Sequence, residues 1–204
     1  MEKWMEWIRE MQSISQAGLH FATDPFDQER YSQLQTLSER IIQEISNVDP
    51  VLLTDILDKD AGYLTPKTDV RSGVFKNGKI LLVQSWDDKK WTLPGGYADV
   101  NLTPSQNAIK EVKEESGFDV DIIRLAGVLD RRKHNYPPRL FHFYKIFFFC
   151  EITGGTPTLG PETLQIDFFS IENLPDLSTG RTSESQLKLL FHHYQNPNLP
   201  PFFD

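Results

Sequence analysis

A short helix with its own start and stop signals limits the folds open to this chain. Thr103 has the side chain of a good N-cap, Pro104 suits the first helical position, and Gln106 completes a capping box with Thr103. Gly117 suits the left-handed position just past a helix end. These signals predict a helix over residues 104–116, and any fold of the chain must accommodate it.

The predicted helix carries three carboxylates on one face. Glu111, Glu114 and Glu115 stand at positions i, i+3 and i+4, and like charges so close together repel one another unless a cation lies among them. Hard divalent ions, magnesium above all, take oxygen ligands and keep positions for water and phosphate oxygens. The glutamates therefore indicate either a metal site or a solvated acidic surface whose charge Lys110 and Lys113 offset.

The loop before the helix favours the metal site. It has the sequence Leu93-Pro94-Gly95-Gly96, and its two glycines let the backbone turn sharply and approach a ligand closely. Together with the helix it resembles the Nudix box, a loop-helix-loop motif. The residues at matching or near-matching places are Gly96, Glu111, Val112, Glu114, Glu115, Gly117 and Phe118. The resemblance covers about residues 66–195.

Two positions depart from the Nudix pattern. Leu102 stands where the box has glutamate, and Lys110 stands where it has arginine. The first change bears on the number of metal ions more than on activity. Lys110 can still pair with Glu114 at i+4, but it lacks the bidentate fork of arginine.

The resemblance implies an α/β fold, a Nudix-type α/β/α sandwich around a mixed sheet, preceded by a small N-terminal helical domain. It implies hydrolysis of a nucleoside diphosphate linked to a further moiety, with Mg²⁺ or Mn²⁺ as cofactor. Glu111 and Glu115 are then the best metal ligands, and Glu114 and Gly96 belong to the same site. The general base varies among Nudix enzymes. The first candidate here is Glu162, in the loop before the last strand, with a plain surface position as its alternative role, and the second candidate is Glu114.

The rest of this region has the pattern of strands. Asn77-Gly78 between two apolar runs, residues 70–75 and 79–84, predicts a β-hairpin. Further strands are expected over about 120–130, 140–151 and 164–170, and a last helix over about 183–194.

The first sixty residues are helical in pattern. Apolar residues recur at helical spacing over residues 2–19. A second helix is expected with Asp24 as its cap and Pro25 as its first position, and a shorter one over about 51–59. We therefore divide the chain into a helical segment, 1–62, and a Nudix hydrolase domain, 63–204. Three short helices have little core of their own, so the segment is expected to form a homodimer or, alternatively, to cover the catalytic domain of its own chain.

Composition fits a soluble cytoplasmic protein. Hydrophobic residues make up 39% of the 204 residues, and no segment reaches the roughly 20 apolar residues of a membrane span. Cys150 is the only cysteine, which excludes a disulfide within the chain and indicates a buried thiol. The N-terminus has no signal-peptide pattern. The formal charge of −8 argues against a protein that coats duplex nucleic acid.

A small anionic substrate then needs local positive charge or metal. Candidate phosphate ligands are Arg71, Arg131 and Arg132, each with a surface ion pair as its alternative role. Candidate stacking groups for a base or a quaternary ammonium are Trp86, Tyr97 and Tyr136, with plain packing as the alternative. His142, in an apolar strand, is either a satisfied buried histidine or a substrate contact.

Flanking motifs narrow the expected substrate. Residues 71–74 (Arg-Ser-Gly-Val) and 178–181 (Ser-Thr-Gly-Arg), with the helical segment, are similar to a bacterial Nudix subgroup that includes CDP-choline pyrophosphatase. The expected reaction is hydrolysis of CDP-choline to CMP and phosphocholine. Two rivals remain: hydrolysis of RNA or an RNA end at the same metal site, favoured by the basic run 131–134, and a non-catalytic nucleotide sensor.

Overall fold

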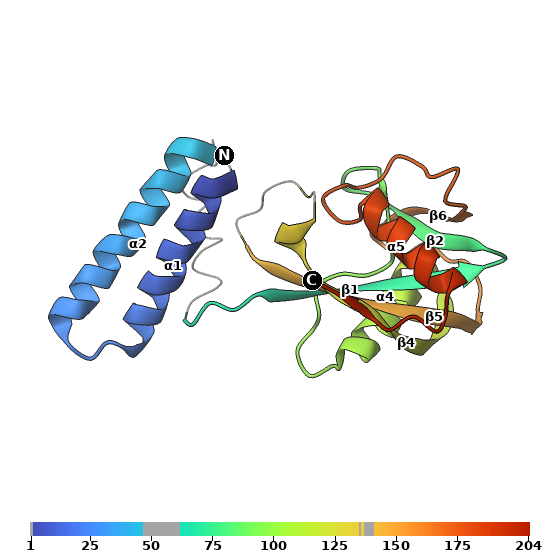
Figure 1. Cartoon of the computed structure of the whole chain (residues 1–204), viewed down its shortest axis with the longest axis horizontal. Coiled ribbons are helices and arrows are strands. Elements are labelled where there is room, and N and C mark those ends of the chain that lie inside the picture. The colour runs from blue at the N-terminus through green and yellow to red at the C-terminus, as the bar shows by residue number, and fades with distance from the viewer. Residues whose placement is uncertain (1, 47–61, 135, 137–140) are drawn as a thin grey trace. The chain divides into compact units, whose positions relative to one another are not determined.

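The computed structural model describes residues 2–46, 62–134, 136 and 141–204 (Figure 1). The chain separates into two compact units, residues 1–66 with 138–141, and residues 67–137 with 142–204. The helix expected over 51–59 lies outside the described residues. Within the described part, no helix is long and apolar enough to cross a membrane.

Unit 1 contains two long helices that pack side by side (Figure 1). Helix α1 spans Glu2–Phe21 and α2 spans Pro25–Ser46, and the Asp24 side chain accepts a hydrogen bond from Phe26 N at 2.7 Å, as its predicted capping role requires. The ring of Tyr31 lies directly on Gly18, where a Cβ atom would come within 2.3 Å of the ring. Large apolar side chains remain exposed on these helices: Trp4, Trp7, Ile14, Phe21, Phe26 and Leu37.

Unit 2 is built on a mixed sheet of seven strands. The strands are β1 Lys67–Lys76, β2 Lys79–Ser85, β3 Trp91–Thr92, β4 Phe118–Asp130, β5 Phe143–Gly155, β6 Thr163–Phe169 and β7 Phe202–Phe203. Their order is β3-β2-β1-β5-β4-β7, with β6 also pairing with β2. The pairs β1–β5 and β4–β7 are parallel and the others antiparallel, so the expected mixed sheet is confirmed.

The predicted hairpin is confirmed at its turn. Asn77 and Gly78 have φ angles of 52° and 73°, the left-handed conformation that a two-residue hairpin turn requires. The strands expected later in the chain are also confirmed, with shifted ends. The two-residue strands β3 and β7 and the 3₁₀ helix η1, Arg131–Lys133, are too short to show a periodic pattern, and only the sheet around them defines them.

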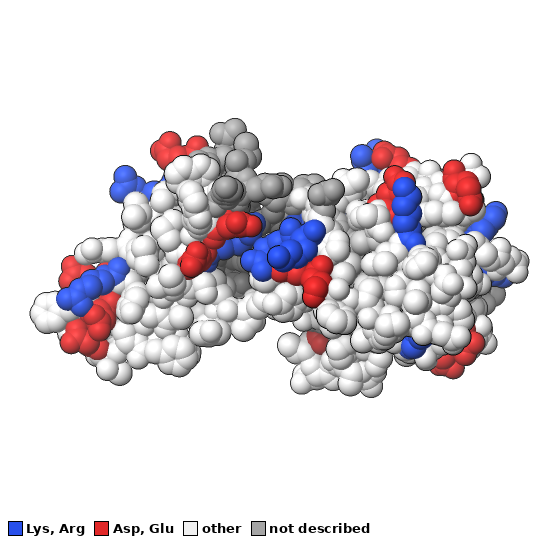
Figure 2. All heavy atoms as spheres, viewed as in Figure 1, with Lys and Arg blue, Asp and Glu red and all other residues white. Residues whose placement is uncertain are grey.

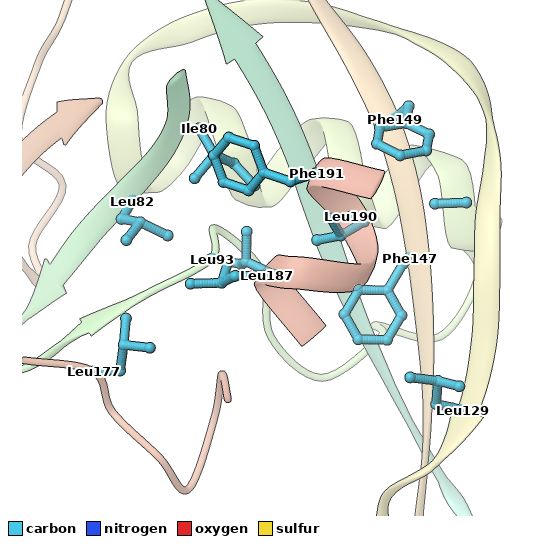
Figure 3. Close-up of a cluster of buried hydrophobic side chains, with 11 residues drawn as sticks. Ile80, Leu82, Leu93, Leu129, Phe147, Phe149, Leu177, Leu187, Leu190 and Phe191 are labelled. Carbon is cyan, nitrogen blue, oxygen red and sulfur yellow. The ribbon is translucent and has the colours of Figure 1, made fainter. Parts of the chain in front are cut away.

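One helix packs on each face of the sheet. Helix α4, Pro104–Ser116, covers the face that carries Val70, Val74 and the buried thiol of Cys150. Helix α5, Glu184–Gln195, covers the other face (Figure 3). The buried cluster under α5 contains Ile80, Leu82, Leu93, Ala126, Leu129, Phe147, Phe149, Leu177, Leu187, Leu190 and Phe191. Successive residues along the strands therefore face α4 on one side and α5 on the other, which is the α/β/α sandwich that the resemblance implied.

Candidate active site

The caps of helix α4 are those expected from the sequence. Thr103 Oγ1 accepts from Gln106 N at 3.2 Å, Gln106 Oε1 accepts from Thr103 N at 2.8 Å, and Gly117 has a φ of 75°. Ala108 and Val112 are fully buried against the sheet. The helix is therefore fixed in both length and rotation, and this rotation determines where its glutamates point.

The loop at residues 93–96 lies along the first half of β1. Val70 N donates to Gly96 O, and Ser72 N donates to Pro94 O, both at 2.9 Å. Gly95 has a φ of 139°, and a Cβ atom there would lie 2.0 Å from the Val70 carbonyl oxygen. Only glycine fits this position, because any side chain would separate the loop from the strand.

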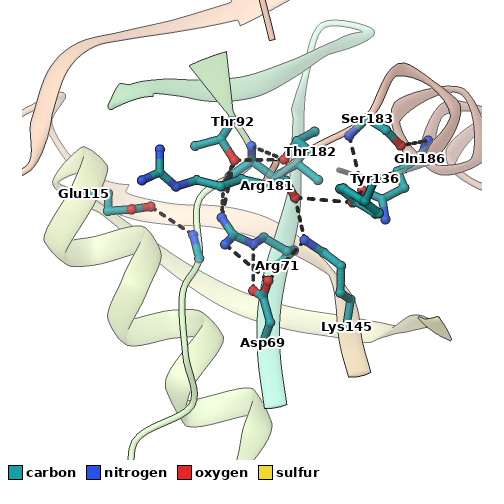
Figure 4. A network of polar contacts seen from close by, with 12 residues as sticks. Asp69, Arg71, Thr92, Glu115, Tyr136, Lys145, Arg181, Thr182, Ser183 and Gln186 are labelled. Atoms are coloured by element: carbon teal, nitrogen blue, oxygen red, sulfur yellow. Dashed lines mark hydrogen bonds and ion pairs between the residues drawn. The ribbon is translucent and has the colours of Figure 1, made fainter. Parts of the chain in front are cut away.

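Two glutamates face this glycine loop. Glu115 Oε2 accepts a hydrogen bond from Gly95 N at 2.9 Å (Figure 4). Glu111 lies over Gly96, where a Cβ atom would be 3.1 Å from Glu111 Oε1. Glu114 contacts Lys110 Nζ at 2.7 Å, the pairing that the sequence predicted. Three of the predicted metal-site residues are thus adjacent: Gly96, Glu111 and Glu115. The fourth, Glu114, forms an ion pair with Lys110.

The charges of these carboxylates are poorly compensated within the chain. Burial raises the pKa of Glu115 to about 7, and the charges of Glu111 and Glu162 act in the same direction against Arg71 and the Gly95 N–H. Burial also raises the pKa of Glu111. A carboxyl group that is hard to ionise gains from any cation brought beside it, which is the electrostatic property of a metal site.

Glu162 and Trp86 belong to segments outside helix α4 and the glycine loop. Glu162 is exposed in the loop before β6, and its carbonyl oxygen accepts from Trp86 N at 3.1 Å. The influence of its charge on the pKa of Glu115 places it within electrostatic range of that carboxylate. Trp86 is 57% exposed, so its ring is available to a ligand beside Glu162.

Arg71 lies beneath the site and not on its surface. Its guanidinium donates from Nε to Asp69 Oδ1 at 2.8 Å and from Nη1 to the Leu93 carbonyl at 3.0 Å, and the residue is 5% exposed (Figure 4). The arrangement does not offer this guanidinium to a substrate phosphate, because burial and partners within the chain occupy it. The expectation of direct phosphate binding by Arg71 is therefore corrected to a supporting role.

The remaining predicted residues fall into separate groups. Arg131 is buried, with its guanidinium 4.7 Å from the centroid of the Tyr136 ring, next to the cluster around Asp69. Arg132 and His142 both contact Asp130, at 2.6 and 3.1 Å, which places them at the end of β4 and the start of β5. The exposed ring of Tyr97 is stacked on Phe143 with centroids 5.4 Å apart.

The donor set fits a hard divalent cation, although its side chains are not gathered around one point. Among the described residues, no three His, Cys, Asp or Glu side chains form a ready metal-binding group. Glu115 is turned to Gly95 N and Glu114 to Lys110. The oxygen donors of Glu111 and Glu115, with raised pKa values and an adjacent backbone carbonyl at Gly96, are nevertheless of the type that magnesium and manganese prefer.

Comparison with known proteins identifies both parts of the chain. Residues 67–190 match the NUDIX domain, and residues 2–57 match a family described as a UDP-X-like, N-terminal oligomerisation domain. A Bacillus subtilis (strain 168) protein named "Putative ADP-ribose pyrophosphatase YjhB" is 43% identical over 202 residues, which cover 99% of this chain and 97% of the relative.

Two solved structures are also similar. A UDP-X diphosphatase is 32% identical with a TM-score of 0.65, and the match covers 100% of this chain and 98% of that one. An ADP-ribose pyrophosphatase from Streptococcus suis is 39% identical with a TM-score of 0.62, over 69% of this chain and 100% of the other. With its capped glutamate helix and glycine loop, this chain belongs to the Nudix hydrolase family and is a pyrophosphohydrolase.

Proposed function

We propose that this enzyme hydrolyses the pyrophosphate bond of a nucleoside diphosphate linked to a sugar or another small moiety, with Mg²⁺ or Mn²⁺ as cofactor. The observation that carries the proposal is the approach of Glu111 and Glu115 to the glycine loop, where both carboxyl groups have raised pKa values. A substrate with two linked phosphates brings the oxygen ligands that a hard divalent ion in such a site lacks.

In the proposed mechanism, Glu111 and Glu115 would hold the cation, with the Gly96 carbonyl, which already accepts from Val70 N, as a further oxygen donor. A cation held there would supply positive charge for the pyrophosphate oxygens and would lower the pKa of water. Glu162 then accepts a proton from the attacking water at its carboxylate, and Trp86 stacks on the base or on the linked moiety. Glu114 is the second choice for the base, because its carboxylate must first break the hydrogen bond from Lys110 Nζ.

The relatives direct the choice of substrates. One is named for ADP-ribose and one solved structure for UDP-X, so ADP-ribose and a UDP-sugar stand first in the test. CDP-choline stays in the panel because exposed Trp86 and Tyr97 can offer aromatic faces to a quaternary ammonium.

RNA is a weaker candidate. Within each unit taken by itself, the described basic side chains on the face shown in Figure 2 form small groups beside acidic ones and no continuous basic track. Binding of a strand needs such a track. A short RNA in the panel tests this directly.

The experiment is product analysis of the purified protein with Mg²⁺ or Mn²⁺. Release of a nucleoside monophosphate and a phosphorylated moiety from ADP-ribose, a UDP-sugar or CDP-choline supports the proposal and ranks the substrates. Cleavage of RNA alone would replace it with the RNA reaction, and no turnover of any compound with either metal would leave a nucleotide sensor.

We further propose that residues 1–62 mediate homodimer formation. The support is the set of large apolar side chains exposed on α1 and α2, where Trp4 and Trp7 are 57% and 50% exposed. The match of residues 2–57 to an oligomerisation domain agrees with it. Light scattering tests the proposal: wild type is expected at twice the chain mass, and a wild-type monomer at micromolar concentration would exclude it.

A further inference from the structure

Lys145 has an unusual place for a charged residue. It lies on β5 inside the apolar run from Phe143 to Cys150, and its exposed fraction of 1% is the smallest among the charged residues that the structure describes. In the parallel pairing of β1 with β5 it stands directly beside Asp69. A buried ammonium is costly unless its hydrogen bonds and charge are well compensated, so its contacts indicate what it contributes.

The ammonium of Lys145 joins a strand to a loop (Figure 4). Its Nζ donates to Asp69 Oδ2 at 3.1 Å on β1 and to the Arg181 carbonyl oxygen at 2.5 Å in the loop before α5. It also lies 5.1 Å from the centroid of the Tyr136 ring. The loop at residues 178–182 is thereby attached to the sheet at Arg181.

On the strand side, the connection continues to the glycine loop. Asp69 holds Arg71 through Nε, and Arg71 Nη1 donates to the Leu93 carbonyl. Leu93 is two residues before Gly95, whose N–H binds Glu115. A chain of direct hydrogen bonds therefore leads from Lys145 to the backbone that positions the proposed metal ligands.

On the loop side, the connection continues to the wall that carries Trp86. Arg181 Nη2 donates to Asp87 Oδ2 at 2.8 Å, and Nη1 lies 3.4 Å from Asp88 Oδ1. Ser178 Oγ also donates to Asp88, at 2.6 Å. These contacts fix residues 86–88, next to the Trp86–Glu162 hydrogen bond, to the loop that Lys145 holds.

We propose that Lys145 is a positioning residue that keeps the glycine loop, residues 93–96, and the loop at residues 86–88 at a fixed separation. The proposal rests on the proposed function, which assigns the first loop to the pyrophosphate and the second, through Trp86, to the stacked part of the substrate. Loss of the Lys145 donor does not touch the Glu111 and Glu115 carboxylates directly. It removes the attachment of the loop at 178–182 to β5, while the bonds of Ser178 and Thr182 to residues 91–93 remain. Substrate binding is therefore expected to change more than the chemical step.

The matched variants are Lys145→Met and Lys145→Gln. Both remove the charge, but only Gln keeps an N–H donor for the Arg181 carbonyl. We expect Lys145→Met to raise KM for the best nucleotide substrate about tenfold with kcat within about threefold of wild type, and Lys145→Gln to raise KM by less than about threefold. Lys188→Met, at an exposed lysine paired with Glu184 on α5, is the control and should change neither.

Hydrogen exchange gives a readout that needs no substrate. In Lys145→Met, the amides of residues 85–90 and 178–182 are expected to exchange faster than in wild type, while those of helix α4 keep their protection. Unchanged exchange in both loops, or a fall in kcat with KM unchanged, would overturn the proposal. If wild type hydrolyses no nucleotide, the proposed function fails, and the exchange result still decides whether Lys145 holds the loops.

Arg181→Gln keeps the proposal testable if Lys145→Met does not fold. It leaves the carbonyl contact to Lys145 in place and removes the contacts to Asp87 and Asp88. It is expected to raise KM and to speed exchange over residues 85–90. Where both variants fold, their effects on KM should be less than multiplicative when combined, because they break the same connection; independent effects, or a silent Arg181→Gln, would contradict it.

Discussion

The pKa of a buried carboxylate shifts in opposite directions in the glutamate pair of helix α4 and in the buried cluster around Asp69. Burial disfavours ionisation in both places. At Asp69 the charges and hydrogen bonds of Arg71 and Lys145 outweigh burial and lower the pKa, whereas at Glu115 burial wins and raises the pKa to about 7. The first carboxylate is satisfied by its own chain, and the second is left for a cation from outside. A pair of buried carboxylates can thus be assigned to structure or to chemistry by what compensates each of them.

The largest effect is expected from neutralising the glutamates, which tests whether they serve chemistry. Glu111→Gln and Glu115→Gln are each expected to lower kcat about a thousandfold, because each removes an oxygen ligand and a charge used in the transition state. The fold should persist, since neither charge has a cationic partner that would be left buried and unpaired. Steady-state kinetics measure the effect, with the exposed Glu172→Gln as control. Turnover near that of wild type in both variants would remove the proposed site.

Neutralising Asp69 should act on stability. Asp69→Asn leaves Arg71 and Lys145 buried without their carboxylate, which is expected to lower the free energy of unfolding by about 3 kcal/mol. Urea denaturation measures the change. Asp176→Asn, which breaks the exposed pair with Lys90, is the comparison and should cost less than about 1 kcal/mol. Equal costs for the two variants would mean that the buried cluster is no better coupled than a surface pair.

A divalent metal ion should stabilise the fold through Glu111 and Glu115 and not through Asp69. Mg²⁺ or Mn²⁺ at a hundred times its Kd is expected to raise the free energy of unfolding by about 2.7 kcal/mol in wild type and in Asp69→Asn, and EDTA should reverse the effect. The double variant Glu111→Gln/Glu115→Gln should show no such increment. Thermal denaturation with and without metal distinguishes the cases, and an unchanged increment in the double variant would place the metal elsewhere.

The smallest effect is expected in the pH dependence of stability. Burial lowers the pKa of Lys145 from 10.5 to about 7, with Asp69 opposing. Between these values the unfolded chain binds a proton that the folded chain does not, so the stability of wild type should rise with pH from about 7 towards 10. Relative to Lys145→Met, which lacks this group, the rise between pH 7 and about 8.5 is expected to be about 2 kcal/mol in urea denaturation. Parallel pH profiles for the two proteins would show that Lys145 stays charged in the fold.

The two clusters also differ in how far the sequence predicts them. The glutamates, the glycines and the caps of α4 lie within residues 95–118, so local spacing is enough to bring them together. Asp69 and Lys145 are 76 residues apart, and only the pairing of β1 with β5 makes them neighbours. A lysine inside an apolar strand was the available signal, since such a residue needs a partner when buried. Arg71 was misassigned to substrate for the same reason: its burial and its contact with Asp69 arise from the assembled sheet.

The same pairing has a consequence for how the protein forms. Helices α1 and α2 are consecutive and make local contacts, so they can associate early. The β1–β5 pair must close a long segment of chain that contains α4, and such closure is paid in chain entropy before its contacts form. During synthesis on the ribosome, β1, β2, β3 and the capped helix α4 all emerge before β5 does. The glutamate helix can then pack on only part of the sheet, and the sheet that supports the site is complete only when β5 pairs with β1 and β4.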